Sequence, residues 1–278
     1  MVRAMEFVSA KGMKMPALGL GTWALDGESC RASVRAALAL GYRHIDTARL
    51  YGNEGAVGTG IRDAGVPRGE IFLTTKIPMG ELREAQVRRN VEESLRLLGT
   101  DYVDLLLIHW PSAREPLAET LAAFAAARAK GQTRFIGVSN FTAALLQEAV
   151  EIHRAPIVCN QVEYHPYLSQ RPVLAAAKKF GLALTAYSPL ARGRVANDRD
   201  LARIGEKYGK SAGQVALRWL LDQKIAAIPK SSRREHLAAN LAVFDFQLSA
   251  ADRAAIDAKR GTTRLVDPSD WAPAWDPP

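Results

Sequence analysis

Four side chains of types that take part in proton transfer stand at or just after the ends of apolar segments. Asp46 and Tyr51 belong to RHIDTARLY (43–51), Lys76 ends IFLTTK, and His109 ends VDLLLIH. Taken singly, each could be a turn, cap or core residue. When successive segments form neighbouring parallel strands, however, their carboxyl ends meet at one edge and bring such side chains together.

The four groups together suit the reduction of a carbonyl. A tyrosine with its ordinary pKa of about 10 is a poor proton donor at neutral pH, and an adjacent ammonium such as Lys76 lowers that pKa. Asp46 can keep Lys76 charged, while His109 can donate to the substrate oxygen and stabilise its developing negative charge. Since no side chain delivers hydride, the reaction requires a nicotinamide cofactor.

A metal site competes for some of the same residues. His44 and Asp46 share one face of a strand, as ligands do in barrel metallohydrolases, and Lys76 could bridge two metals. Such a site needs further histidines and an acidic ligand near the last strands, where the chain has Pro229-Lys230-Ser231 instead. Because a lysine repels a metal ion, we expect no bound metal.

The cofactor has to bind without the usual glycine-rich fingerprint, because no G-x-G-x-x-G follows a strand. Ser139, Asn140 and Gln161 stand at later strand ends and could hydrogen-bond a carboxamide. Tyr187 could stack on a planar ring. The nicotinamide end of a dinucleotide is therefore expected beside these residues.

Two later segments could hold the phosphates of a dinucleotide. The loop 188–194 (SPLARGR) offers backbone amides and two arginines, although a solvated loop is an alternative reading of the arginines alone. Lys230, Ser231 and Arg233 precede the start of a helix, where a phosphate binds well.

Alternating apolar and amphipathic segments position these residues, with short connections throughout. The sequence predicts strands at 17–21, 43–46, 71–76, 103–109, 133–140, 157–164, 182–190 and 225–232. It predicts helices at 28–40, 54–63, 84–98, 117–129, 142–152, 171–179, 198–207, 211–222 and 233–243. This alternation is typical of an α/β fold, the (β/α)8 TIM barrel, with accessory helices and one domain over 1–278.

Both ends of the chain are predicted to lie outside the repeating part. Met5 to Pro16 is expected to form a hairpin around Ala10-Lys11-Gly12 that closes the bottom of the barrel. The tail 261–278, with Trp271 and Trp275 among prolines, is expected to be ordered coil near the mouth of the site.

The composition excludes several classes of protein. A net charge of +8, from 37 Lys+Arg and 29 Asp+Glu, comes without a basic run interleaved with aromatic residues, so we expect no nucleic-acid partner. No apolar run approaches the roughly 20 residues that span a bilayer, and no signal peptide is recognisable. Cys30 and Cys159 give no disulfide framework, which favours a reducing, cytoplasmic location. A monomer is expected.

The motifs closely resemble those of the aldo-keto reductase family over essentially the whole chain. The family pattern G-x-R-x-x-D-T-A-x-x-Y-x-N-E is matched by GYRHIDTARLYGNE (41–54), its histidine segment by LLLIHWP (105–111) and its late lysine motif by IPKSS (228–232). The resemblance implies a (β/α)8 barrel that uses NADPH without a Rossmann domain. The short loops and the ending TTRLVDPSDWAPAWD look most like small bacterial members that reduce 2,5-diketo-D-gluconate or methylglyoxal.

The resemblance also implies a role for each matched residue. Tyr51 would be the general acid, with Asp46, Lys76 and His109 acting as argued above. Trp23 and Trp110 match positions that wall the substrate pocket. Positions along the cofactor would be Ser139, Asn140, Gln161, Tyr187, Ser188, Leu190, Lys230, Ser231 and Asn240.

Two residues depart from the family pattern near the adenosine end of the cofactor. His236 stands where an arginine usually meets the 2′-phosphate, and Ala239 replaces a common glutamate. Exchanging an always-charged guanidinium for an imidazole predicts weakened discrimination between NADPH and NADH. Lys230 and Arg233 would still favour NADPH.

A protein of another class could use the same barrel. A non-catalytic barrel that binds nicotinamide nucleotide could act as a redox sensor or an interaction subunit. The presence of all four candidate catalytic residues argues for the enzyme, an NADP-dependent reductase of small carbonyl compounds.

Overall fold

The computed structural model describes residues 5–277. Its centre is a sheet of eight parallel strands hydrogen-bonded in chain order. The strands are β3 (Leu20–Gly21), β4 (His44–Asp46), β5 (Phe72–Ile77), β6 (Val103–Ile108), β7 (Thr133–Ser139), β8 (Ile157–Glu163), β9 (Ala183–Tyr187) and β10 (Ala226–Ala227). The first and last strands meet through a bridge between Leu18 and Ala227 and a 2.9 Å bond from Gly19 N to Ala227 O. The sheet is therefore a closed (β/α)8 barrel, as predicted.

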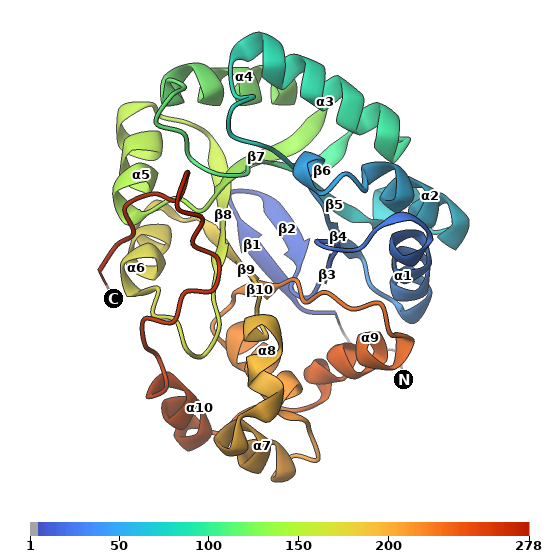
Figure 1. Cartoon of the computed structure of the whole chain (residues 1–278), viewed down its shortest axis with the longest axis vertical. Coiled ribbons are helices and arrows are strands. Elements are labelled where there is room, and N and C mark those ends of the chain that lie inside the picture. Colours follow the sequence, from blue (N-terminus) through green and yellow to red (C-terminus); the bar gives the residue numbers. More distant parts are fainter. Residues whose placement is uncertain (1–4, 278) are drawn as a thin grey trace.

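Helices form a ring around the strands (Figure 1). They are α1 (Gly27–Leu40), α2 (Glu54–Ala64), α3 (Glu84–Leu98), α4 (Leu117–Ala129), α5 (Ala143–Gln147), α6 (Arg171–Phe180), α7 (Arg199–Glu206), α8 (Ala212–Asp222), α9 (Arg234–Leu241) and α10 (Ala250–Asp257). The sequence reading missed α10, whose start is capped by the Ser249 hydroxyl accepting from Asp252 N at 3.1 Å. The expected helix at 142–152 consists of α5 followed by a π-helical turn, Glu148–Ile152.

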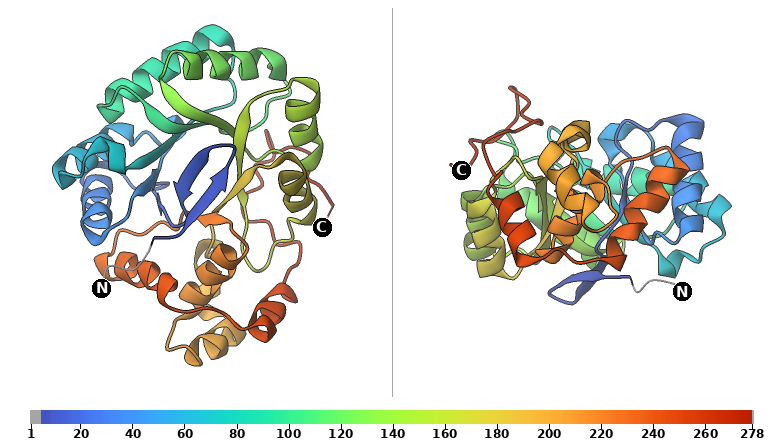
Figure 2. Two further views of the ribbon diagram at one scale, coloured as in Figure 1. Left: turned by 180° about the vertical axis from the view of Figure 1, so that it is seen from behind. Right: turned by 90° about the horizontal axis from the view of Figure 1, so that it is seen from below.

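An antiparallel hairpin closes one end of the barrel, as predicted. It comprises β1 (Phe7–Ala10) and β2 (Met13–Pro16). Met13 and Met15 of β2 are buried in the core, and the Lys11 ammonium donates to Ile157 O at 3.2 Å. Figure 2 shows the hairpin at one end of the barrel and the C-terminal tail at the other.

The barrel interior is packed rather than hollow. Every residue of β5, β6 and β8 is buried, because helices cover the outer face of the sheet and side chains fill the inner one. His44 belongs to this core: its Nδ1 lies 3.2 Å from Pro16 O and its Nε2 lies 3.4 Å from the Thr74 hydroxyl. Within residues 5–277, no group of three or more His, Cys, Asp or Glu side chains could hold a metal ion.

A local irregularity between β7 and β8 orients the polar residues that follow. Their register shifts between Ile136 and Val138, and a Cβ at the intervening Gly137 would lie only 2.6 Å from Cys159 O. Only glycine allows this approach. Beyond it, Ser139 pairs with Gln161, so both side chains arrive at the same strand ends.

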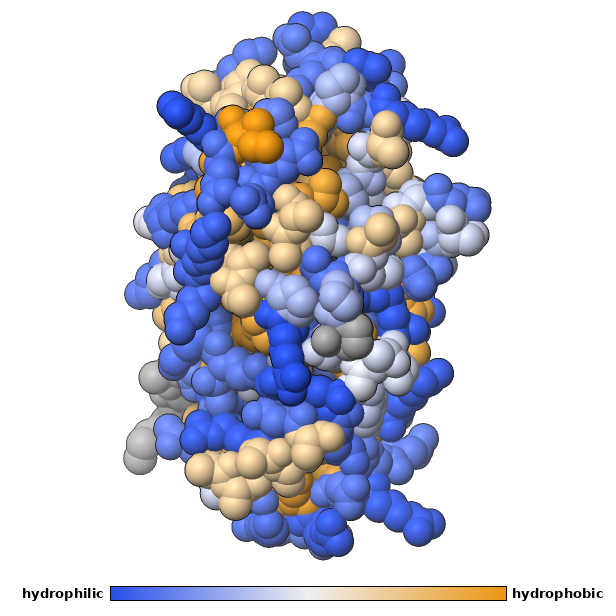
Figure 3. Space-filling model, turned by 90° about the vertical axis from the view of Figure 1, so that its left-hand side faces the viewer, coloured by the Kyte–Doolittle hydropathy of each residue, from blue (hydrophilic) through white to orange (hydrophobic). Residues whose placement is uncertain are grey.

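The face of the molecule seen in Figure 3 is mainly hydrophilic, and apolar residues show on it as separate patches. None of the helices described for residues 5–277 has the length and apolar character needed to cross a membrane. Cys30 and Cys159 are both buried free thiols, and burial raises the pKa of Cys30 to about 11.

Candidate active site

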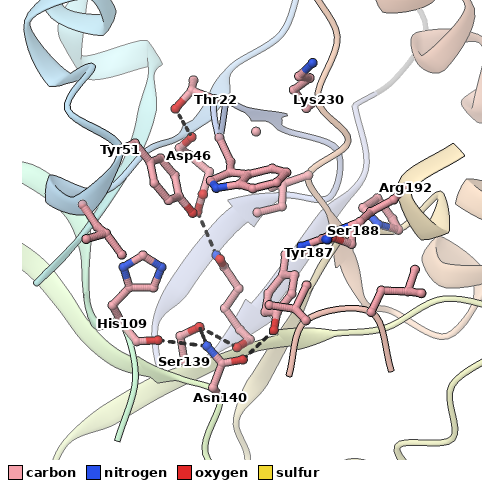
Figure 4. A pocket seen from close by; sticks show the side chains of 18 of the residues that line it. Thr22, Asp46, Tyr51, His109, Ser139, Asn140, Tyr187, Ser188, Arg192 and Lys230 are labelled. Carbon is pink, nitrogen blue, oxygen red and sulfur yellow. Dashed lines mark hydrogen bonds between the residues drawn. The ribbon is translucent and has the colours of Figure 1, made fainter. Parts of the chain in front are cut away.

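A cavity of about 830 Å³ opens at the carboxyl ends of the strands (Figure 4). This volume is typical of a small-molecule or cofactor site. Residues proposed from the sequence make up much of its wall: Trp23, Asp46, Tyr51, His109, Trp110, Ser139, Asn140, Gln161, Tyr187, Ser188, Leu190 and Lys230. Residues far apart in the chain are thus brought to one place.

Lys76 lies beneath the cavity, fully buried between two other site residues. Its ammonium donates to Asp46 Oδ1 at 2.5 Å and to Thr47 O at 2.9 Å, and lies 3.5 Å from the Tyr51 hydroxyl oxygen. The second oxygen of Asp46 accepts from Gln161 Nε2 at 2.7 Å. Asp46 therefore links the lysine to a residue on the opposite side of the barrel.

Local backbone structure explains how Tyr51 reaches this lysine. β4 and β5 pair in parallel, with Asp46 opposite Thr74, which sets the Asp46–Lys76 contact across adjacent strands. After β4 the chain enters a 3₁₀ turn, Arg49–Tyr51, that ends at Gly52 with φ +67°. This left-handed position suits glycine and turns the chain back, so that Tyr51 stands over the strand ends.

Asn53, at the N-terminal cap position of α2, bonds to a loop rather than to the helix. Its amide donates to Thr22 O and to Leu25 O, each at 2.8 Å, and accepts from the Thr47 hydroxyl at 2.8 Å. The side chain makes no cap hydrogen bond to the helix. It instead ties the turn before α2 to the loop that carries Trp23.

The acidity of Tyr51 differs from the expectation. Burial, with a smaller contribution from the negative charge of Asp46, raises the pKa of Tyr51 well above its usual range. Burial also lowers the pKa of Lys76, and contact with Asp46 opposes that shift. Desolvation outweighs the attraction of the ammonium, because the phenol would have to ionise in a site of low polarity. Tyr51 is therefore a protonated phenol at neutral pH.

His109 lies next to Tyr51 in the wall of the cavity. The two rings meet edge to face with centroids 5.6 Å apart. Burial, reinforced by the positive charge of Lys76, lowers the pKa of His109 to about 3. Its Nδ1 is buried and has no hydrogen-bond partner within residues 5–277. Because an orphaned N–H costs more than an orphaned acceptor, we place the single proton on Nε2.

Hydrogen bonds fix the polar residues at the ends of β7 and β9. The Tyr187 hydroxyl donates to Asn140 Oδ1 at 2.7 Å, and Asn140 Nδ2 donates to His109 O at 2.9 Å. The Ser139 hydroxyl donates to Gln161 O at 2.8 Å. Figure 4 shows Tyr187, Asn140 and His109 arranged around one side of the cavity. The ring of Tyr187 is thus held in a defined orientation at its wall.

The loop after β9 has an unusual backbone. Ser188, Ala191 and Arg192 have positive φ values of 47°, 48° and 50°, and Gly193 has φ +90°. Such conformations are unfavourable for residues other than glycine and are retained where the surroundings enforce them. The loop borders the cavity, and the Arg192 guanidinium lies 5.2 Å from the ring centroid of Trp23.

The remaining candidates for cofactor binding lie outside the cavity lining. The Ser231 hydroxyl is buried and accepts from Arg233 N at 3.1 Å. The exposed guanidinium of Arg233 pairs with Glu235 at 2.7 Å, and His236 is exposed on α9. Asn240 is buried at the end of the same helix. These residues follow Lys230, which does line the cavity, so the predicted phosphate segment meets the wall only at its first residue.

Sequence reasoning placed the tail near the mouth but did not identify which of its residues face the cavity. Leu265, Val266, Asp267, Pro268 and Trp271 do so, together with Leu50. The tail is held from below, because the buried carboxylate of Glu163 accepts from Leu265 N at 2.8 Å and from Val266 N at 2.9 Å. No local pattern reveals this contact, since it joins segments about a hundred residues apart.

Comparisons with known proteins agree with this architecture. The model of the Aldo/keto reductase family matches residues 17–260. Methylglyoxal reductase DkgB of Salmonella typhi is 45% identical over 267 residues, which cover 95% of this chain and all of that protein. Morphine 6-dehydrogenase of Pseudomonas putida is 40% identical, with 93% of each chain covered.

Solved structures give the same result. A protein provisionally assigned as a 2,5-diketo-D-gluconic acid reductase B is 44% identical and superposes with a TM-score of 0.96, covering 99% of this chain and 98% of that one. The aldo-keto reductase of Bombyx mori, solved in complex with NADP, is 37% identical with a TM-score of 0.91 and covers 98% and 97% of the two chains.

Proposed function

Because the chain belongs to the aldo/keto reductase family of oxidoreductases, we propose that it reduces small aldehydes and ketones to alcohols with NADPH. Methylglyoxal, 2,5-diketo-D-gluconate and related carbonyl compounds are the proposed substrates, on the basis of the relatives' names. The observation that carries the proposal is the Tyr51 hydroxyl standing 3.5 Å from the buried Lys76 ammonium, beside His109, in one cavity.

Tyr51 is the proposed proton donor. Its raised pKa keeps the phenol protonated until negative charge develops on the substrate oxygen, and the proton then passes from the phenol to that oxygen. Lys76, held by Asp46, stands where it stabilises the phenolate that remains. Bound NADPH would supply the hydride that the carbonyl carbon receives.

His109 is the proposed hydrogen-bond donor to the carbonyl oxygen. As a neutral imidazole with its proton on Nε2, it stabilises developing negative charge without competing with Tyr51 as an acid. Trp23 and Trp110 would flank the substrate, since both line the cavity. A carbonyl oxygen placed between Tyr51 and His109 meets both donors.

The chain's own residues fit a nicotinamide dinucleotide. Ser139, Asn140 and Gln161 present an amide-binding set at the cavity wall, and the ring of Tyr187 is already oriented by its bond to Asn140. The left-handed loop that contains Ser188 and Leu190 would meet the pyrophosphate. The adenosine end would contact Lys230, Ser231, Arg233, His236 and Asn240.

NADPH is the proposed preferred cofactor, with NADH also accepted. Lys230 and Arg233 offer positive charge where a 2′-phosphate would lie, while His236 offers no permanent charge there. Arg233 is partly occupied by Glu235. The preference for NADPH is accordingly expected to be modest.

A spectrophotometric assay tests the proposal directly. Purified protein is mixed with NADPH and methylglyoxal, 2,5-diketo-D-gluconate or a panel of simple aldehydes, and the disappearance of NADPH is followed. Substrate-dependent oxidation of NADPH supports a reductase. Tight binding of NADPH without oxidation by any carbonyl compound would favour the non-catalytic barrel instead.

A further inference from the structure

Charged side chains are unevenly placed around the cavity. The lining contains four side chains of permanent charge: Asp46, Arg192, Lys230 and Asp267. Asp46 is buried and paired with Lys76. Arg192 and Lys230 belong to the two segments proposed to hold the cofactor's phosphates. Arg192 also lies 5.2 Å from the ring centroid of Trp23, where its charge would be engaged by a cofactor phosphate. The carboxylate of Asp267, on the C-terminal tail, is therefore the negative charge of the lining that has no ammonium partner in the described part of the chain.

Asp267 occupies a fixed position beside the apolar wall. Its Oδ1 accepts from the indole nitrogen of Trp275 at 2.8 Å. Trp275 in turn packs edge to face against Trp110, which lines the cavity, with ring centroids 6.1 Å apart. The neighbouring amides of Leu265 and Val266 are held by Glu163. The carboxylate is thus tied to the wall by side-chain and main-chain contacts.

The negative charge of Asp267 is not cancelled locally. Within residues 5–277 it forms no ion pair within 4 Å, although the charge of Arg264, on the tail, attracts it over a longer distance. The Arg264 guanidinium lies over Trp275, 3.6 Å from its ring centroid, and also interacts with Glu163 and Asp276. One guanidinium therefore faces three carboxylates, and this side of the cavity keeps a negative charge.

We infer that Asp267 sets the charge preference of the substrate site, which favours neutral and cationic carbonyl compounds over carboxylates. This inference rests on the proposed reductase function. A substrate carboxylate close to the tail would meet like charge, whereas an ammonium would meet a fixed acceptor. Methylglyoxal would accordingly be a better substrate than a diketo acid. Because Asp267 is itself exposed, solvent moderates the effect.

Three aldehydes of the same shape class test the inference: 4-formylbenzoate, benzaldehyde and 4-(trimethylammonio)benzaldehyde. For each, kcat/KM is measured with the wild-type chain and with Asp267→Asn, whose amide oxygen still accepts from Trp275. Ratios of variant to wild type cancel the electronic differences among the aldehydes. We expect the ratio to rise about three- to fivefold for the anion and to fall by a similar factor for the cation, with benzaldehyde between them.

Binding is measured separately, by quenching of the cavity tryptophans when each aldehyde is added to the complex with NADP. Asp270→Asn is the matched control, because Asp270 lies three residues along the tail, bonds to Ser269 and is absent from the cavity lining. It should leave all three ratios near one.

Equal ratios for the three aldehydes, in turnover and in binding, overturn the assignment of Asp267. A wild-type chain that reduces neither these aldehydes nor methylglyoxal nor 2,5-diketo-D-gluconate overturns the proposed function, and the binding ratios then decide the charge inference by themselves.

Discussion

The Lys76 ammonium lies 3.5 Å from the Tyr51 hydroxyl oxygen, although the two residues are 25 positions apart. Parallel pairing of β4 with β5 positions Lys76, and the turn ending at Gly52 positions Tyr51. A shift of either strand by one residue would turn Asp46 or Lys76 to the opposite face of the sheet. The proton-donating geometry is therefore a property of strand register.

Replacing Tyr51 with phenylalanine should abolish reduction while leaving the cofactor bound. The variant lacks the transferable proton but keeps the ring, so we expect kcat to fall by about 10² or more and the Kd for NADPH to change little. Single-turnover kinetics and fluorescence titration measure the two effects. Tyr102→Phe, which removes a hydroxyl bonded to Arg134 at the rim of a separate hollow, is the control. Turnover of Tyr51→Phe at the wild-type rate would refute the assignment.

Replacing Asp46 with asparagine should destabilise the fold in a pH-dependent way. The change leaves a fully buried ammonium without its anion, for which a loss of about 3 kcal/mol in unfolding free energy is expected at pH 7. Burial already lowers the pKa of Lys76, and removing Asp46 removes the largest contributions that oppose this shift.

The sign of the pH dependence follows from the direction of the Lys76 shift. Between the lowered pKa of the folded variant and the ordinary value of 10.5 for the unfolded chain, the unfolded chain binds more protons. The stability of Asp46→Asn relative to wild type should therefore recover as pH rises through this window. Urea unfolding at several pH values measures it, and a difference that is constant with pH would contradict the account.

His109 should not titrate in the working range of the enzyme. A pKa of about 3 lies below the ordinary 6.5, so the imidazole is neutral at all pH values above about 4. We expect kcat/KM to show no inflection from this residue between about pH 5 and pH 8, and a decline only at alkaline pH, where Tyr51 loses its proton. A fall in kcat/KM below about pH 6.5 that disappears in His109→Gln would contradict this expectation.

Exchange of His236 for arginine should strengthen the preference for NADPH. A guanidinium at this exposed place on α9 adds a permanent charge near the proposed 2′-phosphate site, so affinity for NADPH should rise about tenfold while that for NADH stays nearly constant. Fluorescence titrations with both cofactors measure this, with His236→Gln as the uncharged control. A wild-type preference for NADPH above about 10³ would contradict the weak discrimination expected here.

The barrel could be predicted largely from the sequence, because helical periodicity and short apolar segments alternate without interruption. Helices α3 and α4 have the predicted bounds, Glu84–Leu98 and Leu117–Ala129. The first and last strands are shorter than predicted, since β3 and β10 each have two residues at the closing seam. Helix α10 was missed; it is only eight residues long, and its apolar residues are alanines and one isoleucine.

The candidate site, too, could be predicted from the sequence only in part. Residues at strand ends are predictable, because the barrel brings all strand ends to one mouth. The cavity-facing tail residues and the raised pKa of Tyr51 depend on tertiary contacts and on desolvation, neither of which leaves a local pattern. Asn53 shows the same limit, since its side chain bonds to a loop some 30 residues away rather than to its own helix.

Glu163 holds the tail through the backbone N–H groups of Leu265 and Val266, so these two bonds involve none of the tail's side chains. Every residue type except proline supplies such an N–H. Exchange of the side chains at 265 and 266 therefore leaves these two bonds in place, whereas Asp267 holds the tail through its own bond to Trp275 as well. Glu163 thereby keeps the 265–266 part of the cavity wall in place whatever side chains it presents. Substrate selectivity can therefore change there with little loss of stability.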